Sequence, residues 1–288
     1  MGLTTLVSTE TLARRLDDPA WIVFDCRFTL TNAETGRRAY ASGHVPGARY
    51  AHLEEALSAP VTPASGRHPL PSPDAFADQL GRWGVNADKQ VVVYDDSFGS
   101  MAVRLWWMLR WVGHESVALL DGGWPKWRRE KHPVTTALPA VQPTDFPLRL
   151  APGLQIDAGQ VNTRRQDKNT LIVDARPEER FTGDYEPLDK IAGHIPGSVN
   201  WPFEENLDLG GAYLPAEELR ENYLKLLHDV PPEQVIHSCG SGVTACHNVL
   251  AMEIAGLSGS QLYAGSWSEW ITDPAHPVET GENGVLCV

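Results

Sequence analysis

Short apolar runs, each bounded by polar or turn-forming residues, recur along the chain of 288 residues. Four of them have the length and the β-branched content of buried strands, and they lie at residues 22–27, 90–94, 171–176 and 234–237. Apolar residues with helical periodicity follow the second and fourth runs, over residues 100–112 and 243–255, and a glycine stands directly after each segment. Strands that alternate with helices predict parallel sheets with helices on both faces.

The second half of the chain repeats the first half. The motif Gly-His-x-Pro-Gly occurs at residues 43–47 and again at residues 193–197, which is 150 positions later. Five further identical pairs stand 143 positions apart: Gly99 and Gly242, Gly113 and Gly256, Gly122 and Gly265, Trp124 and Trp267, and Trp127 and Trp270. This duplication predicts two similar α/β domains, at residues 1–140 and 153–288, joined by a linker at residues 141–152.

Composition and charge narrow the class of protein. The chain carries a formal net charge of -13, with 42% apolar and 21% charged residues, which is typical of a globular protein and disfavours binding to nucleic acid or to an anionic membrane. No run of about 18 apolar residues occurs, and residues 1–10 lack the basic start and apolar core of a signal peptide. The four cysteines are too few for a disulfide scaffold, so we expect a cytoplasmic protein.

The segment with the clearest chemistry is residues 237–246, where the fourth strand passes into a helix. It contains Cys239, and the glycines Gly240 and Gly242 allow the backbone to turn tightly. Backbone N–H groups in such a loop point inward, and the helix N-terminus adds partial positive charge, so an anion is favoured at the centre of the loop. A thiol in this position is stabilised as the thiolate. Cys239 is therefore a candidate nucleophile that requires neither a metal nor an organic cofactor.

The first domain offers an internal comparison for this loop. At the spacing of 143, Asp96 stands at the position of Cys239, and Ser97 and Phe98 replace the two residues that follow. A carboxylate cannot carry a sulfur atom, and it repels other anions. We therefore expect the first domain to be catalytically silent. The remaining cysteines, to which we assign no role, are Cys26, Cys246 and Cys287.

These motifs resemble those of the tandem rhodanese-type sulfurtransferases over essentially the full length of the chain. In that family both domains carry the Gly-His-x-Pro-Gly turn, and only the second keeps the cysteine. The loop Cys-Gly-Ser-Gly-Val-Thr at residues 239–244 is similar to that of 3-mercaptopyruvate sulfurtransferases, whereas the thiosulfate-using branch has Arg-Lys after the cysteine. The resemblance implies that a sulfane sulfur passes from 3-mercaptopyruvate, through a persulfide on Cys239, to an acceptor. This acceptor would be thioredoxin, a low-molecular-weight thiol or cyanide.

The resemblance also implies roles for individual residues. The loop residues expected to contact the donor are Gly240, Ser241, Gly242, Val243 and Thr244. Ser241 would in addition relay a proton, and His68 and Glu54 match the histidine and the acidic residue proposed as its partners. Arg180 matches the arginine that binds the carboxylate of the donor. The second arginine of the family falls near residues 189–190, where Lys190 is the residue that could replace it.

Other functions compete with this interpretation. A cysteine-dependent phosphatase has a similar strand, loop and helix, but it needs an arginine six residues after the cysteine, where this chain has Ala245. A non-catalytic binding module of the same fold would need neither Cys239 nor the two glycines that follow it, Gly240 and Gly242. Among enzymes of the family, the alternative is a sulfurtransferase that takes thiosulfate as its donor and cyanide as its acceptor.

Overall fold

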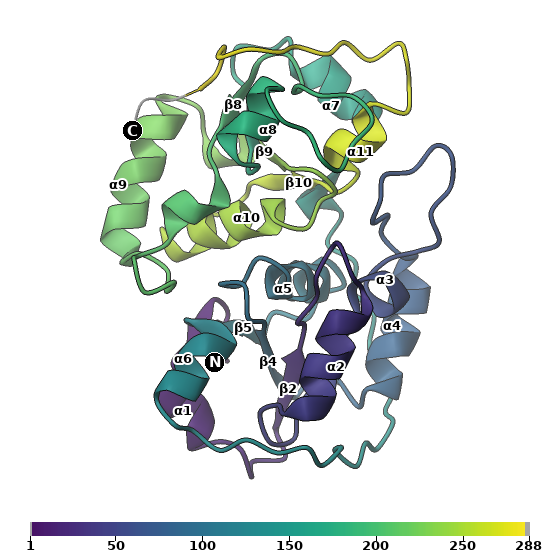
Figure 1. Ribbon diagram of the computed structural model, residues 1–288, viewed down its shortest axis with the longest axis vertical. Helices are drawn as coiled ribbons and strands as arrows, with labels where there is room; N and C mark the ends of the chain where they lie inside the picture. The colour runs from purple at the N-terminus through teal and green to yellow at the C-terminus, as the bar shows by residue number, and fades with distance from the viewer. Residues whose placement is uncertain (1, 286–288) are drawn as a thin grey trace. The chain divides into compact units, whose positions relative to one another are not determined.

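The computed structural model describes residues 2–285 of the chain, which form two compact units (Figure 1). The first unit contains residues 2–59, 71–151 and 209–213, and the second contains residues 60–70, 152–208 and 214–285. The segments 60–70 and 209–213 therefore each belong to the unit opposite to the one in which the sequence placed them. Cys287 lies outside the described residues.

The first unit is built on a five-stranded parallel sheet with the strand order β1-β5-β4-β2-β3. The strands are β1 (Leu6–Val7), β2 (Trp21–Asp25), β3 (Arg49–Tyr50), β4 (Gln90–Tyr94) and β5 (Val117–Leu120). The helices are α1 (Thr9–Ala13), α2 (Glu34–Ser42), α3 (Leu53–Ala56), α4 (Pro73–Arg82), α5 (Ala102–Trp111) and α6 (Gly123–Arg129).

The second unit has a five-stranded parallel sheet with the order β6-β10-β9-β7-β8. The strands are β6 (Gln155–Ile156), β7 (Leu171–Asp174), β8 (Ser198–Asn200), β9 (Val235–Ser238) and β10 (Gln261–Tyr263). The α-helices are α7 (Ala158–Arg164), α8 (Glu178–Thr182), α9 (Ala216–Leu227), α10 (Ala245–Ile254) and α11 (Ser266–Trp270), and the 3-10 helices are η1 (Pro152–Leu154), η2 (Phe203–Asn206) and η3 (Pro232–Gln234). Figure 1 shows this sheet between α7 and α11 on one side and α9 and α10 on the other.

The two sheets have the same topology, which confirms the predicted pair of similar α/β domains. Each strand of the first sheet has a counterpart at the same place in the second, β4 in the position of β9 and β2 in the position of β7. The helices after β4 and β9 also end as predicted, because Gly113 (φ 89°) and Gly256 (φ 68°) adopt the left-handed conformation that glycine tolerates best.

The Asp-x-Arg motif at the end of β7 fixes the following turn. Arg176 donates from Nη2 to Asp174 at 2.7 Å and to the Gly193 carbonyl oxygen at 2.8 Å, and both charged residues are buried. In the first unit, Arg27 makes the same bonds to Asp25 and to the Gly43 carbonyl oxygen. The repeated Asp-x-Arg and Gly-His-x-Pro-Gly motifs are therefore two halves of one structural element in each domain.

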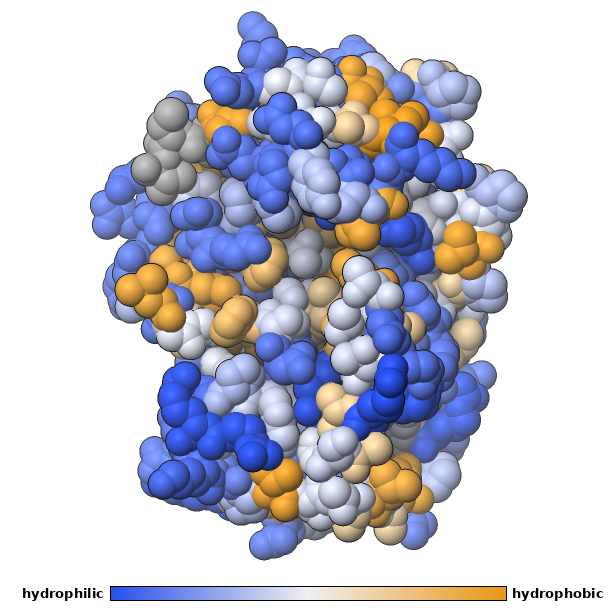
Figure 2. Space-filling model, in the orientation of Figure 1, coloured by the Kyte–Doolittle hydropathy of each residue, from blue (hydrophilic) through white to orange (hydrophobic). Residues whose placement is uncertain are grey.

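The core of the second unit packs large aromatic and aliphatic side chains against its sheet. Trp267 and Trp270 of α11 are fully buried and join a cluster with Ile172, Ile236 and Tyr263. Burial of this size is the main stabilising term of the fold. The face in Figure 2 is mostly hydrophilic, with separate small hydrophobic patches. Among residues 2–285, no helix has both the length and the apolar composition that crossing a bilayer needs.

Candidate active site

The loop after β9 has the predicted position and geometry. Residues 239–244 connect Ser238, the last residue of β9, with Ala245, the first residue of α10. Gly242 has a φ of 72°, and a Cβ atom at this position would come within 2.1 Å of the Ala264 carbonyl oxygen. Glycine is therefore required at residue 242 both by its backbone conformation and by the space around it.

The start of α11 holds this loop by its backbone. The backbone N–H of Cys239 donates to Ser266 Oγ at 3.0 Å, and the Cys239 carbonyl oxygen accepts from the Trp267 N–H at 3.0 Å. The Gly240 carbonyl oxygen accepts from the Ser268 N–H at 2.9 Å. The main chain around the thiol is consequently fixed before any substrate binds.

The Cys239 side chain is buried, with 1% of its surface exposed, and polar groups surround the sulfur. Burial by itself raises the pKa of the thiol, but hydrogen bonds from the Thr244 hydroxyl and from the backbone N–H groups of Ser241 and Ala245 outweigh it. The net effect is a pKa below the ordinary value of a cysteine. A thiolate held in this way can act as a nucleophile and can carry an anionic terminal sulfur.

His68 and Ser241 form a direct hydrogen bond. His68 Nδ1 lies 2.8 Å from Ser241 Oγ, and both side chains are at most 5% exposed. The contact is possible because residues 60–70, which form no helix or strand, belong to the second unit. A histidine that contacts a loop serine can move a proton to or from its hydroxyl group. Glu54 is an exposed residue of α3 in the first unit, and its role as a further partner stays a prediction.

Arg180 and an arginine that the sequence reasoning missed, Arg67, both face the loop. A Cβ atom on Gly240 would lie 2.8 Å from Arg67 Nη2 and 3.3 Å from both terminal nitrogens of Arg180. Arg180 pairs with Glu186 at 2.9 Å and with Asp189 at 3.1 Å, and Arg67 pairs with Asp189 through Nη1. In the sequence, the position of Arg67 directly before the predicted site residue His68 was the signal that could have identified Arg67 as a site residue.

Lys190 lies at the edge of this arrangement. It is exposed, and it lines a cavity of about 450 Å³ together with Arg67, Asp189 and Ser268. Of the remaining predicted loop residues, Val243 is buried with 3% of its surface exposed, and Thr244 bonds to the sulfur as described above. The predicted site residues of the second unit therefore gather around Cys239, with Lys190 further out.

The equivalent loop of the first unit is occupied by its own carboxylate. Tyr94 pairs with Asp25 in the sheet as Ser238 pairs with Asp174, so the residue after the strand is Asp95 in one domain and Cys239 in the other. Asp95, and not Asp96 as the spacing predicted, therefore takes the place of the cysteine. The spacing was misleading because the first loop has one more residue between its strand and its glycine.

In the first domain, the Asp95 carboxylate is bound by backbone N–H groups of its own loop, as the Cys239 thiol is in the second domain. Its carboxylate oxygens accept from the backbone N–H groups of Ser97, Gly99, Met101 and Ala102 at 2.8–2.9 Å. Burial raises the pKa of Asp95, and these four hydrogen bonds oppose that effect. The first loop therefore directs its backbone N–H groups at a carboxylate of the chain itself, where the second loop directs them at the Cys239 sulfur.

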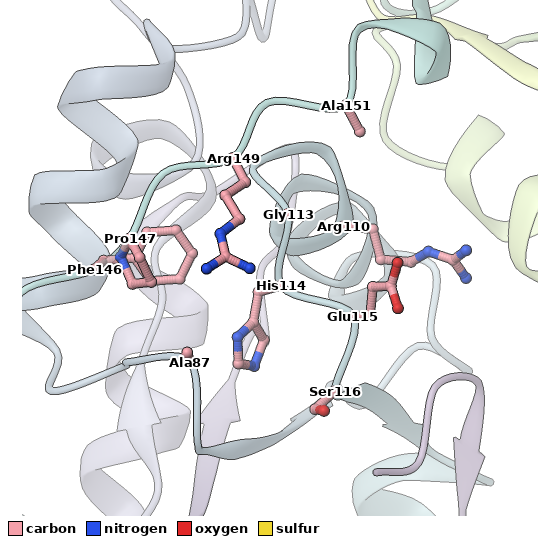
Figure 3. A pocket seen from close by; sticks show the side chains of 10 residues that line it. All are labelled: Ala87, Arg110, Gly113, His114, Glu115, Ser116, Phe146, Pro147, Arg149 and Ala151. Atoms are coloured by element: carbon pink, nitrogen blue, oxygen red, sulfur yellow. The ribbon is translucent and has the colours of Figure 1, made fainter. Parts of the chain in front are cut away.

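A separate cavity lies in the first unit, at the end of α5 (Figure 3). It has a volume of about 480 Å³, and residues 113–116 and residues 146–151 contribute to its walls. In Figure 3 the side chain of Arg149 points toward His114, while Arg110 lies beside Glu115. This cavity is lined by none of the predicted site residues.

One cluster of acidic and histidine side chains in the first unit has the spacing of metal ligands. Glu34, His52 and Glu55 bring potential ligand atoms within 4.8 Å of one another. However, His52 Nδ1 accepts hydrogen bonds from the backbone N–H groups of Glu54 and Glu55, so the proton of the neutral ring is on Nε2. Arg37 pairs with both carboxylates. His52 therefore caps the start of α3, and Glu34 of α2 and Glu55 of α3 share an ion pair with Arg37, so the geometry does not suit a cation.

Comparison with known proteins places the chain in a family. The model of the rhodanese-like domain matches residues 8–130 and residues 157–273. Over 284 residues, the chain is 44% identical to a probable 3-mercaptopyruvate sulfurtransferase of Pseudomonas aeruginosa, covering 98% of this chain and 100% of that protein. It is 36% identical over 290 residues to the thiosulfate sulfurtransferase of Mus musculus, covering 97% and 96% of the two chains.

Solved structures agree with the sequence comparisons. SseA from Escherichia coli matches with a TM-score of 0.79 and 33% identity, over 93% of this chain and 100% of that chain. The 3-mercaptopyruvate sulfurtransferase from Leishmania major matches with a TM-score of 0.82 and 30% identity, over 93% of this chain and 74% of that chain. The chain therefore belongs to the rhodanese family, with two rhodanese-like domains in tandem. Within that family it is a sulfurtransferase, as the resemblance in its motifs predicted.

Proposed function

We propose that this sulfurtransferase takes a sulfane sulfur from 3-mercaptopyruvate and passes it, through a persulfide on Cys239, to a thiol or to cyanide. The observation that carries the proposal is the environment of the Cys239 sulfur. The Thr244 hydroxyl and two backbone N–H groups donate hydrogen bonds to it, and they lower the pKa of the thiol despite its burial. The sequence identity of 44% to a protein named for this donor supports the same choice.

The first half of the reaction forms a sulfur–sulfur bond. The Cys239 thiolate attacks the sulfur of the donor, the carbon–sulfur bond of the donor breaks, and its electron pair passes to the methylene carbon. The carbon product is the enolate of pyruvate, which takes up one proton to become pyruvate. Cys239 keeps the sulfur as a persulfide, whose anionic form is stabilised by the hydrogen-bond donors that held the thiolate.

Ser241 and His68 are placed to handle the proton of this step. The two side chains are joined by a hydrogen bond of 2.8 Å. The Ser241 hydroxyl can therefore give its proton to the enolate while His68 donates a proton back to the Ser241 oxygen. Arg180, which is 13% exposed and faces Gly240, would hold the carboxylate of the donor through paired hydrogen bonds. Both roles agree with those that the family resemblance implied.

The second half of the reaction removes the outer sulfur. An acceptor thiolate attacks this sulfur, the sulfur–sulfur bond breaks, and the electron pair returns to Cys239 as a thiolate. A dithiol such as thioredoxin then releases the sulfur as hydrogen sulfide by forming its own disulfide, a low-molecular-weight thiol keeps it as a persulfide, and cyanide keeps it as thiocyanate. The chemistry is that of thiol–disulfide exchange, so it needs no metal and no organic cofactor.

Thiosulfate is the second candidate donor. Relatives named thiosulfate sulfurtransferase share 36% identity with the chain, and two arginines lie beside Gly240 where the loop itself carries no charge. The reaction with thiosulfate differs only in its leaving group, which is sulfite. Cys239 would again keep one sulfur.

The test is steady-state kinetics of the purified full chain with both donors and one acceptor, cyanide. We expect a higher kcat/KM for 3-mercaptopyruvate than for thiosulfate, and no turnover of either donor by Cys239→Ser. A higher kcat/KM for thiosulfate would assign the enzyme to the second donor. Turnover by Cys239→Ser near the wild-type rate would contradict the persulfide mechanism itself.

A further inference from the structure

Arg49 in the first unit has no acidic partner, although part of its side chain is buried. Its Nε atom is buried and makes no hydrogen bond, and among residues 2–285 no carboxylate forms an ion pair with it. Burial lowers the pKa of the guanidinium group, and the Tyr40 side chain opposes this effect. A positive charge that is partly removed from water without a counter-charge costs free energy, which a bound anion would offset.

The Arg49 side chain lines a cavity of about 380 Å³ in the first unit, which we call the Arg49 cavity. Arg49 is the first residue of β3, and Trp21 and Ile22, which also line the cavity, begin β2. The cavity therefore lies at the amino ends of these strands, whereas Asp95 follows the carboxyl end of β4. In a parallel sheet these ends form opposite edges, so the cavity is separate from the loop that corresponds to the active site.

The other walls of the Arg49 cavity are partly apolar and partly polar. Leu16 and Trp21 supply apolar surface, and Asn86 and Lys89 supply polar groups. Lys89 donates from Nζ to the Pro19 carbonyl oxygen at 2.8 Å, which fixes a second positive charge at the cavity wall. The volume is in the range of pockets that hold small molecules. These walls suit a molecule that has an apolar body and an anionic group.

Two carboxylates of the cavity wall restrict the charge of that anionic group. Asp17 and Asp18 both line the cavity. Asp18 accepts hydrogen bonds from Arg15 at 3.2 Å and from the Ala20 N–H at 3.0 Å. Both carboxylates repel an anion, and the repulsion is about twice as large for a dianion as for a monoanion. A carboxylate, with one charge, is therefore favoured over a phosphate ester with two.

The second domain lacks this pair of positive charges. The strand register pairs Phe24 with Arg49 in the first sheet and Val173 with Val199 in the second, so Val199 takes the place of Arg49. Counting back along β4 and β9 in the same way places Glu233 at the position of Lys89. The fold itself therefore does not require positive charge at this edge of the sheet, and the two charges are specific to the first domain.

We propose that the Arg49 cavity is a second small-molecule site, in which Arg49 binds the carboxylate of a small organic acid through paired hydrogen bonds and Trp21 packs against the apolar part of the acid. The site belongs to the first domain, whereas Cys239 belongs to the second. The inference therefore goes beyond the proposed function and does not rest on it.

Titration of the full chain with phenylacetate, followed by ¹H–¹⁵N NMR, tests the site. The backbone N–H signals of Gly84 and Asn86, which line the cavity, should shift, and the signal of Gly240 reports any binding at the Cys239 loop separately. Arg49→Gln should weaken the binding that Gly84 and Asn86 report by at least about tenfold, because charged hydrogen bonds are lost. Arg129→Gln, which removes an exposed positive charge from α6, is the matched control and should leave the affinity unchanged.

Thermal denaturation gives a second measurement. Arg49→Val removes the partly buried charge and uses the residue type that the second domain has in this place, so it should raise the Tm of the ligand-free chain. Phenylacetate should raise the Tm of the wild type but not that of Arg49→Val. If the role of Arg49 were only structural, Arg49→Val would lower the Tm, and phenylacetate would change both proteins equally.

The outcomes that would overturn the inference are specific. The site is wrong if the signals of Gly84 and Asn86 do not shift at about 10 mM phenylacetate, or if wild type and Arg49→Gln bind it equally well. Tighter binding of phenyl phosphate than of phenylacetate would overturn the assignment to a carboxylate. Cys239→Ser should bind phenylacetate in this cavity as the wild type does, so failure of the proposed sulfur transfer and failure of this inference are read from different measurements.

Discussion

His68 and Ser241 are joined by a hydrogen bond of 2.8 Å although 173 residues separate them in the sequence. The bond joins the loop 60–70 to the loop that carries Cys239, within one compact unit. It also gives Ser241 a partner whose ring nitrogen can donate a proton to the hydroxyl group or accept one from it.

This bond predicts a selective loss of catalysis. Ser241→Ala and His68→Gln should each lower kcat with 3-mercaptopyruvate by about 10-fold to 100-fold, with a smaller effect on the first half-reaction with thiosulfate, whose leaving group sulfite needs no proton on carbon. The double variant should lose little more than either single variant, because the two residues act as one unit. Independent losses that multiply in the double variant would argue against a shared proton relay.

Thr244→Val tests the stabilisation of the thiolate. The variant loses the hydroxyl that bonds to the sulfur, so the pKa of Cys239 should rise. The measurement is the rate of alkylation by iodoacetamide as a function of pH, after reduction of the protein. The midpoint should move to higher pH in Thr244→Val and should move back toward wild type in Thr244→Ser. A midpoint that is the same in all three proteins would mean that the hydroxyl does not hold the thiolate.

The lowered pKa of Cys239 also predicts how stability changes with pH. A group whose pKa is lower in the folded state binds its proton less tightly there, so it adds stability above the pKa of the unfolded thiol, about 8.5. This contribution is lost as the pH falls through the folded pKa. The free energy of unfolding of reduced wild type, relative to Cys239→Ser, should therefore increase with pH over that interval. Urea denaturation at several pH values measures it, and a difference that decreases with pH would be inconsistent with a lowered pKa.

Gly242→Ala should disrupt the active-site loop. The added Cβ atom would lie 2.1 Å from the Ala264 carbonyl oxygen, at a φ of 72°. We expect activity to fall more than about tenfold through displacement of the amides around Cys239. Gly47→Ala is the matched control, since Gly47 has a φ of 78° with no atom within 4 Å of the new Cβ. That control should cost only the backbone strain, about 1 kcal/mol, and keep its activity. Equal behaviour of the two variants would show that the close contact at residue 242 has no consequence.

The fold was predictable because the same two structural motifs occur in both halves of the sequence. The Gly-His-x-Pro-Gly turn and the Asp-x-Arg strand end bond to each other in both domains, so each copy validates the other. The cysteine loop was predictable for a similar reason, since a strand, two glycines and a helix leave the backbone little choice.

The residues that sequence reasoning misplaced depend on tertiary structure. Asp95 was overlooked because a single extra residue in the first loop shifts the pairing between strand and glycine, which only the register of the sheet reveals. Arg67 was overlooked because its charge reaches Gly240 from a segment without regular structure, whose position no local pattern encodes. A count of the charges within the cysteine loop therefore underestimates the charge at its entrance.

The most direct test of the central claim is mass spectrometry of the reduced chain after brief exposure to 3-mercaptopyruvate. We predict that the intact protein gains the mass of one sulfur atom, that the fragment containing Cys239 carries it, and that cyanide removes it. Protein that turns over the donor while its Cys239 fragment stays unmodified would contradict the account, as would a sulfur found on Cys26 or Cys246 instead.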